Sequence, residues 1–222
     1  MWKVDLHNHT VFSKDSLASP QKMIEAAKAA GLDKMAITEH NNLRGALAAK
    51  EIDPDFVIVG EEVMTTEGEI IAYFVKEEVP KGLRPEEAIE RLREQGAVIS
   101  VPHPLDAVRR SAMGLESVLR IINVVDAVEV FNARVLPFDP ANRKADELAE
   151  KYGKLKTAGS DAHTPWETGH AYVVMPEFSN AEEFKKSLAK GQIVGRKSIP
   201  FVHLASTYAK WAKKLKLVRV VT

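Results

Sequence analysis

The segment from His7 to His9 places two imidazoles one residue apart, directly after an apolar stretch near the start of the chain. If that stretch is a strand, residues i and i+2 point to the same face, so both rings would aim at one point. Two convergent imidazoles can chelate a transition metal ion. The 222-residue chain has only seven histidines, and the pairing of two of them here predicts a metal site.

Three further histidines also follow apolar stretches. His40 ends one such stretch, His103 ends another, and His163 comes just after a third. In a barrel of parallel strands the C-terminal strand ends converge on one face, where active sites form. A single histidine at such a position would be interpreted as a hydrogen-bonded structural residue. Five histidines that all follow this rule predict metal binding instead.

The composition limits the chemistry available to such a site. The chain contains no cysteine, so any metal must be held by nitrogen and oxygen ligands, and disulfides and cysteine nucleophiles are excluded. It is 45% hydrophobic and 28% charged, which predicts one globular unit with a substantial core. No apolar run approaches the ~20 residues that span a bilayer, and no signal peptide pattern opens the chain. We expect a soluble, cytoplasmic protein with no membrane partner.

The elements that must position these side chains alternate along the chain. Predicted strands cover residues 2–7, 34–40, 56–63, 70–75, 97–103, 127–132, 155–161 and 171–175. Predicted helices cover residues 19–31, 84–96 and 139–153, and the first of them has Ser19 as N-cap and Gly31 just past its end. Repeated strand-then-helix order predicts an α/β fold with a largely parallel sheet, either a closed or nearly closed barrel or an open doubly wound sheet.

Five short motifs occur in order along the first three quarters of the chain: DLHNHT, TEH, GEEV, PHP and GSDAH. Together they resemble the PHP superfamily, the polymerase and histidinol phosphatase domain. The resemblance implies a distorted (β/α)7 barrel that holds two or three divalent metal ions and hydrolyses phosphoesters with a metal-activated hydroxide. It places the catalytic barrel in residues 1–195 and leaves residues 196–222 as a basic C-terminal segment packed on the barrel.

The resemblance also implies a ligand set. One metal ion would be held by His7, His9, Glu62 and Asp161, a second by Glu62 and His103, and a third by Asp15, His40 and His163. The family pattern of Gly, any residue, Glu and an apolar residue selects Glu62 over Glu61 as the bridging carboxylate. Asn132 stands where many relatives carry a histidine, so it is a weak candidate ligand of the second metal ion. Glu69 is an alternative oxygen ligand.

The residue types agree with this grouping. A mixture of imidazole and carboxylate ligands suits zinc, manganese or iron, and a bridging carboxylate holds two cations close enough to activate one water. Asp5 and Glu39 stand beside candidate ligands and are expected either to orient imidazole N–H groups or to be solvated acids.

Candidates for catalysis and phosphate binding lie near the same strand ends. Glu62 and Asp161 are candidate catalytic residues, and Arg109 and Arg110 follow the PHP motif in a predicted loop. Arg134 follows Asn132 and could reach the same site. Arginine matches phosphate oxygens in bidentate geometry, and surface salt bridges are the alternative for all three arginines. His170 is a candidate general acid. His203 is expected to be packed in the fold.

The C-terminal segment is strongly basic. No acidic residue follows Glu183, whereas ten basic residues do: Lys185, Lys186, Lys190, Arg196, Lys197, Lys210, Lys213, Lys214, Lys216 and Arg219. A solvated helix face or a polyanionic partner would explain this charge. Tyr208, Trp211, Ala212 and Leu215 form one helical stripe, which is expected to dock on the barrel or to contact nucleic acid.

The favoured function is a metal-dependent phosphoesterase that acts on a mono- or diester of a small metabolite or nucleotide. A metal-dependent amidohydrolase is an alternative. It would use a carboxylated lysine or another metal bridge at a strand end, and no predicted strand ends in lysine. A noncatalytic PHP-like module of a nucleic-acid-processing complex is another. Loss of catalysis should have removed several ligands, and only the Asn132 position departs from the pattern.

Overall fold

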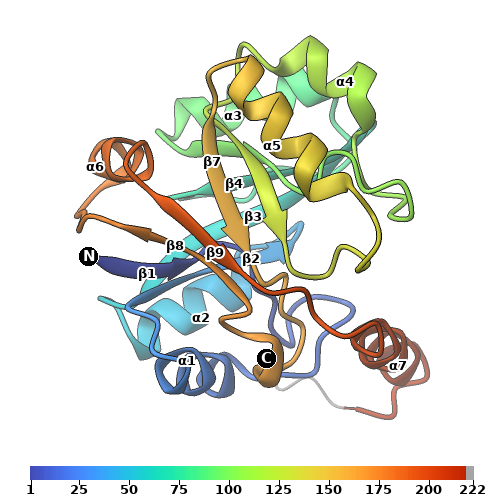
Figure 1. Cartoon of the computed structure of the whole chain (residues 1–222). Helices are drawn as coiled ribbons and strands as arrows, with labels where there is room; N and C mark the ends of the chain where they lie inside the picture. Colours follow the sequence, from blue (N-terminus) through green and yellow to red (C-terminus); the bar gives the residue numbers. More distant parts are fainter. Residues whose placement is uncertain (219–222) are drawn as a thin grey trace.

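The strands form one sheet that curls into a nearly closed barrel with helices on its outside (Figure 1). The computed structural model describes residues 1–218. Within them, nine strands have the order β7-β6-β5-β4-β3-β2-β1-β8-β9. They are β1 (Trp2–Asp5), β2 (Lys34–His40), β3 (Val57–Thr65), β4 (Gly68–Tyr73), β5 (Val98–Val101), β6 (Ala127–Asn132), β7 (Leu155–Gly159), β8 (Ala171–Met175) and β9 (Gln192–Gly195).

The sheet is largely parallel, which confirms the predicted fold class. Only β4 and β8 run antiparallel to their neighbours, and the other strand pairs are parallel. The parallel strands therefore carry their C-terminal ends to one end of the barrel. The hairpin from β3 to β4 returns Glu69 to this same end, because Glu69 pairs with Met64 near the end of β3.

Residues that follow β1 close the barrel against β7. The Leu6 amide donates to the carbonyl oxygen of Ala158 over 3.3 Å, and Asn8 forms a parallel bridge with Ala162. We call this contact the β1–β7 seam. It brings the DLHNHT segment (residues 5–10) and the GSDAH segment (residues 159–163), which are far apart in the sequence, side by side.

Helices cover the barrel on the outside (Figure 1). The first, α1, begins where predicted, because Ser19 Oγ accepts a hydrogen bond from the Lys22 amide and Pro20 occupies the first turn. The helices are α1 (Pro20–Ala29), α2 (Arg44–Ile52), α3 (Pro85–Glu94), α4 (Gly114–Ile121), α5 (Ala141–Lys151), α6 (Ala181–Leu188) and α7 (Val202–Lys214), with a 3-10 turn at Pro165–Glu167. No helix among residues 1–218 combines the length and the hydropathy of a bilayer-spanning segment.

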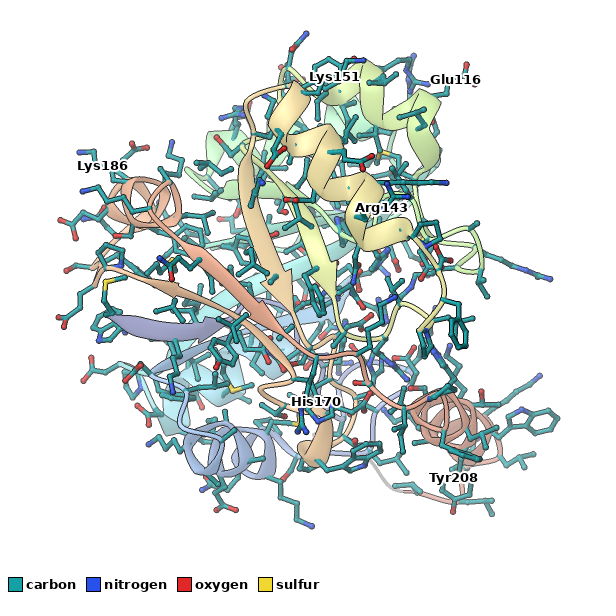
Figure 2. The ribbon with its side chains drawn as sticks, in the orientation of Figure 1. Glu116, Arg143, Lys151, His170, Lys186 and Tyr208 are labelled. Carbon is teal, nitrogen blue, oxygen red and sulfur yellow. The ribbon has the colours of Figure 1, made fainter. Side chains whose placement is uncertain are left out.

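Helix α7 packs through a different face than the sequence predicted. Tyr208, Trp211 and Leu215 are 64%, 62% and 58% exposed, and Figure 2 shows Tyr208 on the outer side of the helix. The docking of these three residues on the barrel was therefore a wrong prediction, whereas Ala212 of the same predicted stripe is buried. The buried residues of α7 are Val202, Ser206, Ala209 and Ala212. Their small side chains allow the helix backbone to approach the barrel closely. Arg219, counted in the basic segment, lies outside the described residues.

Candidate metal centre

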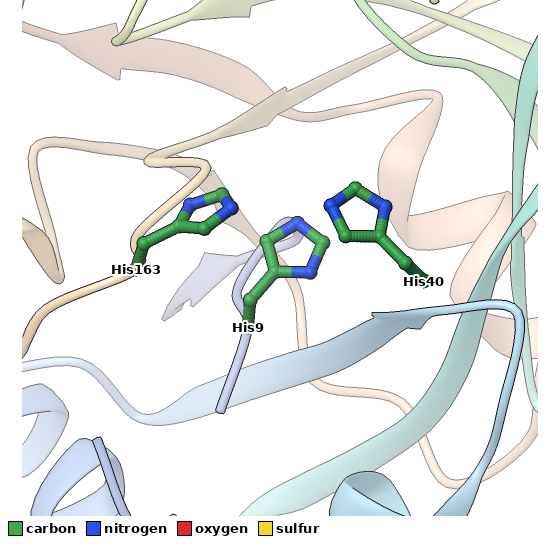
Figure 3. Close-up of side chains that lie close together, drawn as sticks. All are labelled: His9, His40 and His163. Carbon is green, nitrogen blue, oxygen red and sulfur yellow. The ribbon is translucent and has the colours of Figure 1, made fainter. Parts of the chain in front are cut away.

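Five imidazoles meet at the C-terminal end of the barrel. The His9 ring lies between the rings of His40 and His163, with centroid separations of 4.4 and 4.3 Å (Figure 3). The His7 ring lies 5.1 Å from that of His9 and 5.7 Å from that of His103. The Nε2 atoms of His7 and His9 are 3.1 Å apart, so the two rings aim at one point as the one-residue spacing requires.

Glu62 on β3 lies at the centre of this group. Its Oε1 is 3.1 Å from His103 Nε2 and 3.4 Å from His7 Nε2, and its Oε2 is 2.9 Å from His40 Nδ1. Glu61, one residue earlier, points to the other face of the strand and accepts a hydrogen bond from the Val79 amide at 3.0 Å. The alternation of side chains along a strand therefore places Glu62, and not Glu61, among the histidines.

Three more carboxylates border the imidazoles. Asp161 Oδ1 is 3.5 Å from His9 Nε2, and Asp15 Oδ1 is 3.3 Å from His163 Nε2. Glu69 Oε1 is 3.4 Å from His40 Nδ1, which brings this alternative ligand within reach of Glu62. The backbone of Asp161 has φ of 52°, in the left-handed region that non-glycine residues rarely adopt and that is concentrated at functional sites.

The donor atoms fit divalent metal ions. Four triads bring one ligand atom from each side chain within 4.8 Å of one another: His9, His40 and His163; His7, Glu62 and His103; His7, His9 and Asp161; His40, Glu62 and Glu69. Considering residues 1–218 only, six buried atoms of the cluster, most of them with close neighbours, make no hydrogen bond of suitable geometry: Asp15 Oδ1, His40 Nδ1, Glu62 Oε2, Glu69 Oε2, His103 Nδ1 and Asp161 Oδ1. Buried polar atoms are normally satisfied, and cations would satisfy most of these.

The pKa shifts of Glu62 and His9 suit metal ligands, whereas those of His7 and His40 do not. Burial opposes the shift at His7 and His40, but the surrounding carboxylates raise the pKa of both imidazoles well above the usual value. Burial alone would raise the pKa of Glu62, but the imidazoles of His7 and His40 outweigh burial and hold that pKa well below its usual range. Burial lowers the pKa of His9, and the neighbouring His163 and His40 lower it further. An ionised carboxylate and a neutral imidazole are the forms that bind metals.

Glu129 is a site residue that the sequence reasoning missed. Its Oε1 is 3.0 Å from His7 Nδ1, and its Oε2 accepts from the His103 amide at 2.7 Å. A carboxylate behind a ligand imidazole fixes its tautomer and orientation. The available signal was an acidic residue between two valines in the middle of the strand 127–132.

The two acids that were expected to orient imidazoles behave differently from each other. Glu39 accepts from the Ser13 hydroxyl, and Ser13 Oγ lies 3.2 Å from His9 Nδ1, so Glu39 reaches His9 through Ser13. Asp5 instead accepts from the backbone amides of Ser160 and Gly169, each at 3.0 Å, and contacts no imidazole. Asp5 therefore holds the β1–β7 seam, and neither acid is solvated.

Asn132 turns its amide nitrogen toward the cluster. This nitrogen donates to Asp161 Oδ2 and to Glu129 Oε2, both at 3.1 Å, while Oδ1 accepts from the Arg134 amide at 2.9 Å. In this orientation Asn132 positions Asp161 and does not offer its oxygen to a metal ion.

The candidate arginines occupy different places. Arg109 Nη1 is 2.6 Å from Asp161 Oδ2, and Arg109 lines the cavity above the cluster. Arg134 is buried and bonds His163 Nδ1 at 2.7 Å. Arg110 is exposed and does not line that cavity. Of the two adjacent arginines, only Arg109 reaches the site.

The last two histidines reverse their expected places. His170 Nδ1 is 2.8 Å from Ser198 Oγ and does not line the cavity, which argues against a role as general acid. His203, expected to be packed, is exposed and lines the cavity from α7.

The cavity above the cluster measures about 310 Å³. It is bordered by Lys14, Asp15, His40, Met64, Glu69, Asp106, Val108, Arg109, Ser111, Arg134, Leu136, His163, His203, Ser206, Thr207 and Lys210.

The chain matches two family models. Residues 5–99 match the PHP domain and residues 139–193 match the PHP-associated model. An uncharacterized protein of Methanocaldococcus jannaschii, MJ0417, is 42% identical over 180 residues, which are 80% of this chain and 72% of that protein.

Two solved structures have a similar fold. One is a two-domain protein from Bacteroides vulgatus that contains a predicted PHP-like metal-dependent phosphoesterase, with a TM-score of 0.71 and 19% identity over 94% of this chain and 69% of that chain. The other is PsfC from Pseudomonas syringae, with a TM-score of 0.70 and 18% identity over 96% of this chain and 98% of that chain.

Proposed function

The chain belongs to the PHP domain family, and from this premise we propose that it is a metal-dependent phosphoesterase. The observation that carries the proposal is the convergence of five buried or nearly buried imidazoles with Glu62 and Asp161 at the C-terminal barrel end. The family and this donor set support a metal-dependent hydrolase. Phosphate esters as the substrates, and zinc, manganese or iron as the metals, are our proposal.

The chain's own residues would divide the work. His7, His9, His40, His103, His163, Asp15, Glu62 and Asp161 would hold two or three divalent ions, with Glu69 as a further oxygen ligand. When bound, these ions would supply an activated water and neutralise charge on the phosphoryl group. Glu129 and the Ser13–Glu39 pair hold the ligand imidazoles in place. Arg109 would bind a phosphoryl oxygen, because its guanidinium lines the cavity beside Asp161.

Metal analysis combined with turnover tests the proposal. Untreated protein should carry at least two divalent ions per chain, and it should hydrolyse p-nitrophenyl phosphate or its bis ester. Chelation should abolish turnover, and manganese, zinc or iron should restore it. Arg109→Ala should lower turnover, whereas Arg110→Ala should change it little. Protein that neither binds metal nor turns over either ester after reconstitution with all three metals would overturn the proposal.

A contact with nucleic acid is a second proposal, which the outward face of α7 favours. Tyr208 and Trp211 are exposed on this face, and aromatic rings beside lysines can stack on bases while the lysines contact phosphates. Single-stranded oligonucleotides should then quench the fluorescence of Trp211 in a salt-dependent way. No difference between wild type and Trp211→Phe in such a titration would contradict this contact.

A further inference from the structure

The N-terminal half of helix α7 is joined by Arg134 to His163, one of the candidate metal ligands. The Nη2 atom of Arg134 donates to the Val202 carbonyl at 2.9 Å and to Ser206 Oγ at 2.7 Å. The Nη1 atom of the same side chain lies 2.7 Å from His163 Nδ1. Because Arg134 is buried, this bridge fixes the helix relative to a candidate metal ligand.

A second tie holds the C-terminal half of α7. Lys213 Nζ donates to the Val11 carbonyl at 2.6 Å and to the Ser13 carbonyl. These carbonyls belong to the loop that carries Asp15, another candidate ligand. Helix α7 is thus anchored to the site at both ends and forms one wall of its cavity.

Helix α7 also places Lys210 beside the candidate metal ligands. Lys210 lines the cavity, and its Nζ lies 3.3 Å from Asp15 Oδ2. Arg109, from the loop after β5, lines the same cavity and pairs with Asp161 at 2.6 Å. Two cations from separate elements therefore face one cavity, and each pairs with a carboxylate that is placed to bind metal.

Metal binding would weaken the ion pairs that Lys210 and Arg109 form with Asp15 and Asp161. A carboxylate that coordinates a divalent ion is largely neutralised, so its attraction for a neighbouring ammonium or guanidinium weakens. Lys210 and Arg109 would then be available to an anionic substrate. A phosphate monoester carries close to two negative charges at neutral pH, whereas a diester carries one and needs space for a second ester group. The cavity of about 310 Å³ is at the lower limit for small-molecule sites.

We propose that Lys210 is a substrate-binding residue supplied by α7 and that, together with Arg109, it makes the site selective for phosphate monoesters. The inference rests on the proposed phosphoesterase function and deepens it. It also gives α7 a role in substrate recognition that is separate from its outward aromatic face.

The test compares a phosphate monoester with a diester, in proteins with and without the positive charge of residue 210. The metal-loaded 222-residue chain and its Lys210→Gln variant are assayed with p-nitrophenyl phosphate and with bis(p-nitrophenyl) phosphate. Wild type should prefer the monoester, and Lys210→Gln should lower kcat/KM for the monoester by about 10- to 100-fold and for the diester by much less. Lys214→Gln, an exposed lysine one turn further along α7, should change neither. Lys210→Arg should retain most of the monoester activity.

A binding measurement separates recognition from catalysis. Calorimetric titration with inorganic phosphate should show weaker binding to metal-loaded Lys210→Gln, with unchanged metal content. Equal losses for both esters, a loss of metal, or no change in phosphate binding would each overturn the role of Lys210. Preference of the wild type for the diester would also overturn the inference while leaving the phosphoesterase function intact. Absence of turnover with either ester would instead overturn the proposed function itself.

Discussion

Glu62 and Glu61 are adjacent in sequence but occupy opposite faces of β3, and this difference is directly testable. Glu62→Gln removes the charge that lies among four imidazoles, so we expect metal content and turnover to fall by at least about 10- to 100-fold. Glu61→Gln should leave both nearly unchanged, because Glu61 contacts the Val79 amide outside the cluster. Metal analysis after exhaustive dialysis measures this. Metal loss confined to the Glu61 variant would contradict the assignment.

Glu61 should instead affect the pH dependence of stability. Burial raises the pKa of Glu61 to about 7. The hydrogen bond from the Val79 amide opposes this rise, and the negative charge of the neighbouring Glu78 adds to it. A carboxyl whose pKa is higher in the folded state favours folding when protonated. Its contribution is full below its unfolded pKa of about 4.5 and is lost as the pH rises through about 7.

Urea denaturation of metal-free wild type and Glu61→Gln measures this effect. Between pH 5 and pH 8, wild type should lose about 2 kcal/mol of unfolding free energy more than the variant. The comparison isolates Glu61 because all other titrating groups are shared. Parallel pH profiles for the two proteins would contradict the prediction.

Sequence motifs identified the residues at the centre of the cluster but not those that support them. His7 and His9 were identifiable because residues i and i+2 of an extended segment point to the same face, although β1 itself ends at Asp5. Glu129 was not, because its partner His7 is 122 positions away and no local pattern records that contact. The orientation of Asn132 likewise depends on Asp161 and Arg134, which the fold alone brings to it.

The β1–β7 seam leaves no room for a side chain at Gly159. A Cβ added there would lie 2.2 Å from His7 Cβ and 2.8 Å from the His7 amide nitrogen. Gly159→Ala should therefore displace His7, lower the metal content, and cost about 1–3 kcal/mol of stability or more. Metal analysis and denaturation of the same preparation test both effects.

Gly153→Ala provides a matched control for the seam. It adds the same methyl group where no atom lies within 4 Å, at a residue with φ of 61°. We expect it to lose some stability through backbone strain but to keep its metal. If Gly159→Ala retains full metal occupancy, the seam does not position His7 as described.

At the scale of elements, strongly patterned segments were predictable and weakly patterned ones were not. The strands 34–40, 127–132 and 171–175 agree with β2, β6 and β8 at both ends. Strand β9 is mostly exposed and shows no apolar alternation. Helix α2 has neither a capping side chain nor the first-turn proline that marks α1 and α3, so neither element gave a clear signal. In α7 the buried residues Val202, Ser206, Ala209 and Ala212 recur with the same helical spacing as the exposed aromatic residues. The sequence analysis placed the aromatic residues on the buried face, and of the predicted stripe only Ala212 is buried.

For the whole molecule, metal removal should lower thermal stability. Ions that bind only the folded state stabilise it by about 2.7 kcal/mol at 100 times their Kd. For a domain of this size that corresponds to roughly 5–10 °C in the unfolding midpoint. Calorimetry of chelated and reconstituted protein measures the shift, and Glu62→Gln should show a smaller one. Equal midpoints for chelated and reconstituted wild type would contradict this linkage.

The β1–β7 seam has a consequence for the order of events during synthesis. The candidate ligands run from His7 to His163, and the seam that joins their segments needs residues 158 to 162. A ribosome-bound chain that ends before these residues holds the DLHNHT segment without its partner, so it cannot assemble the full site. Contacts between such distant residues also form slowly. We therefore expect the nascent chain to bind metal ions only after about three quarters of it has emerged from the ribosome. Metal uptake by arrested chains of increasing length measures the length at which the barrel closes.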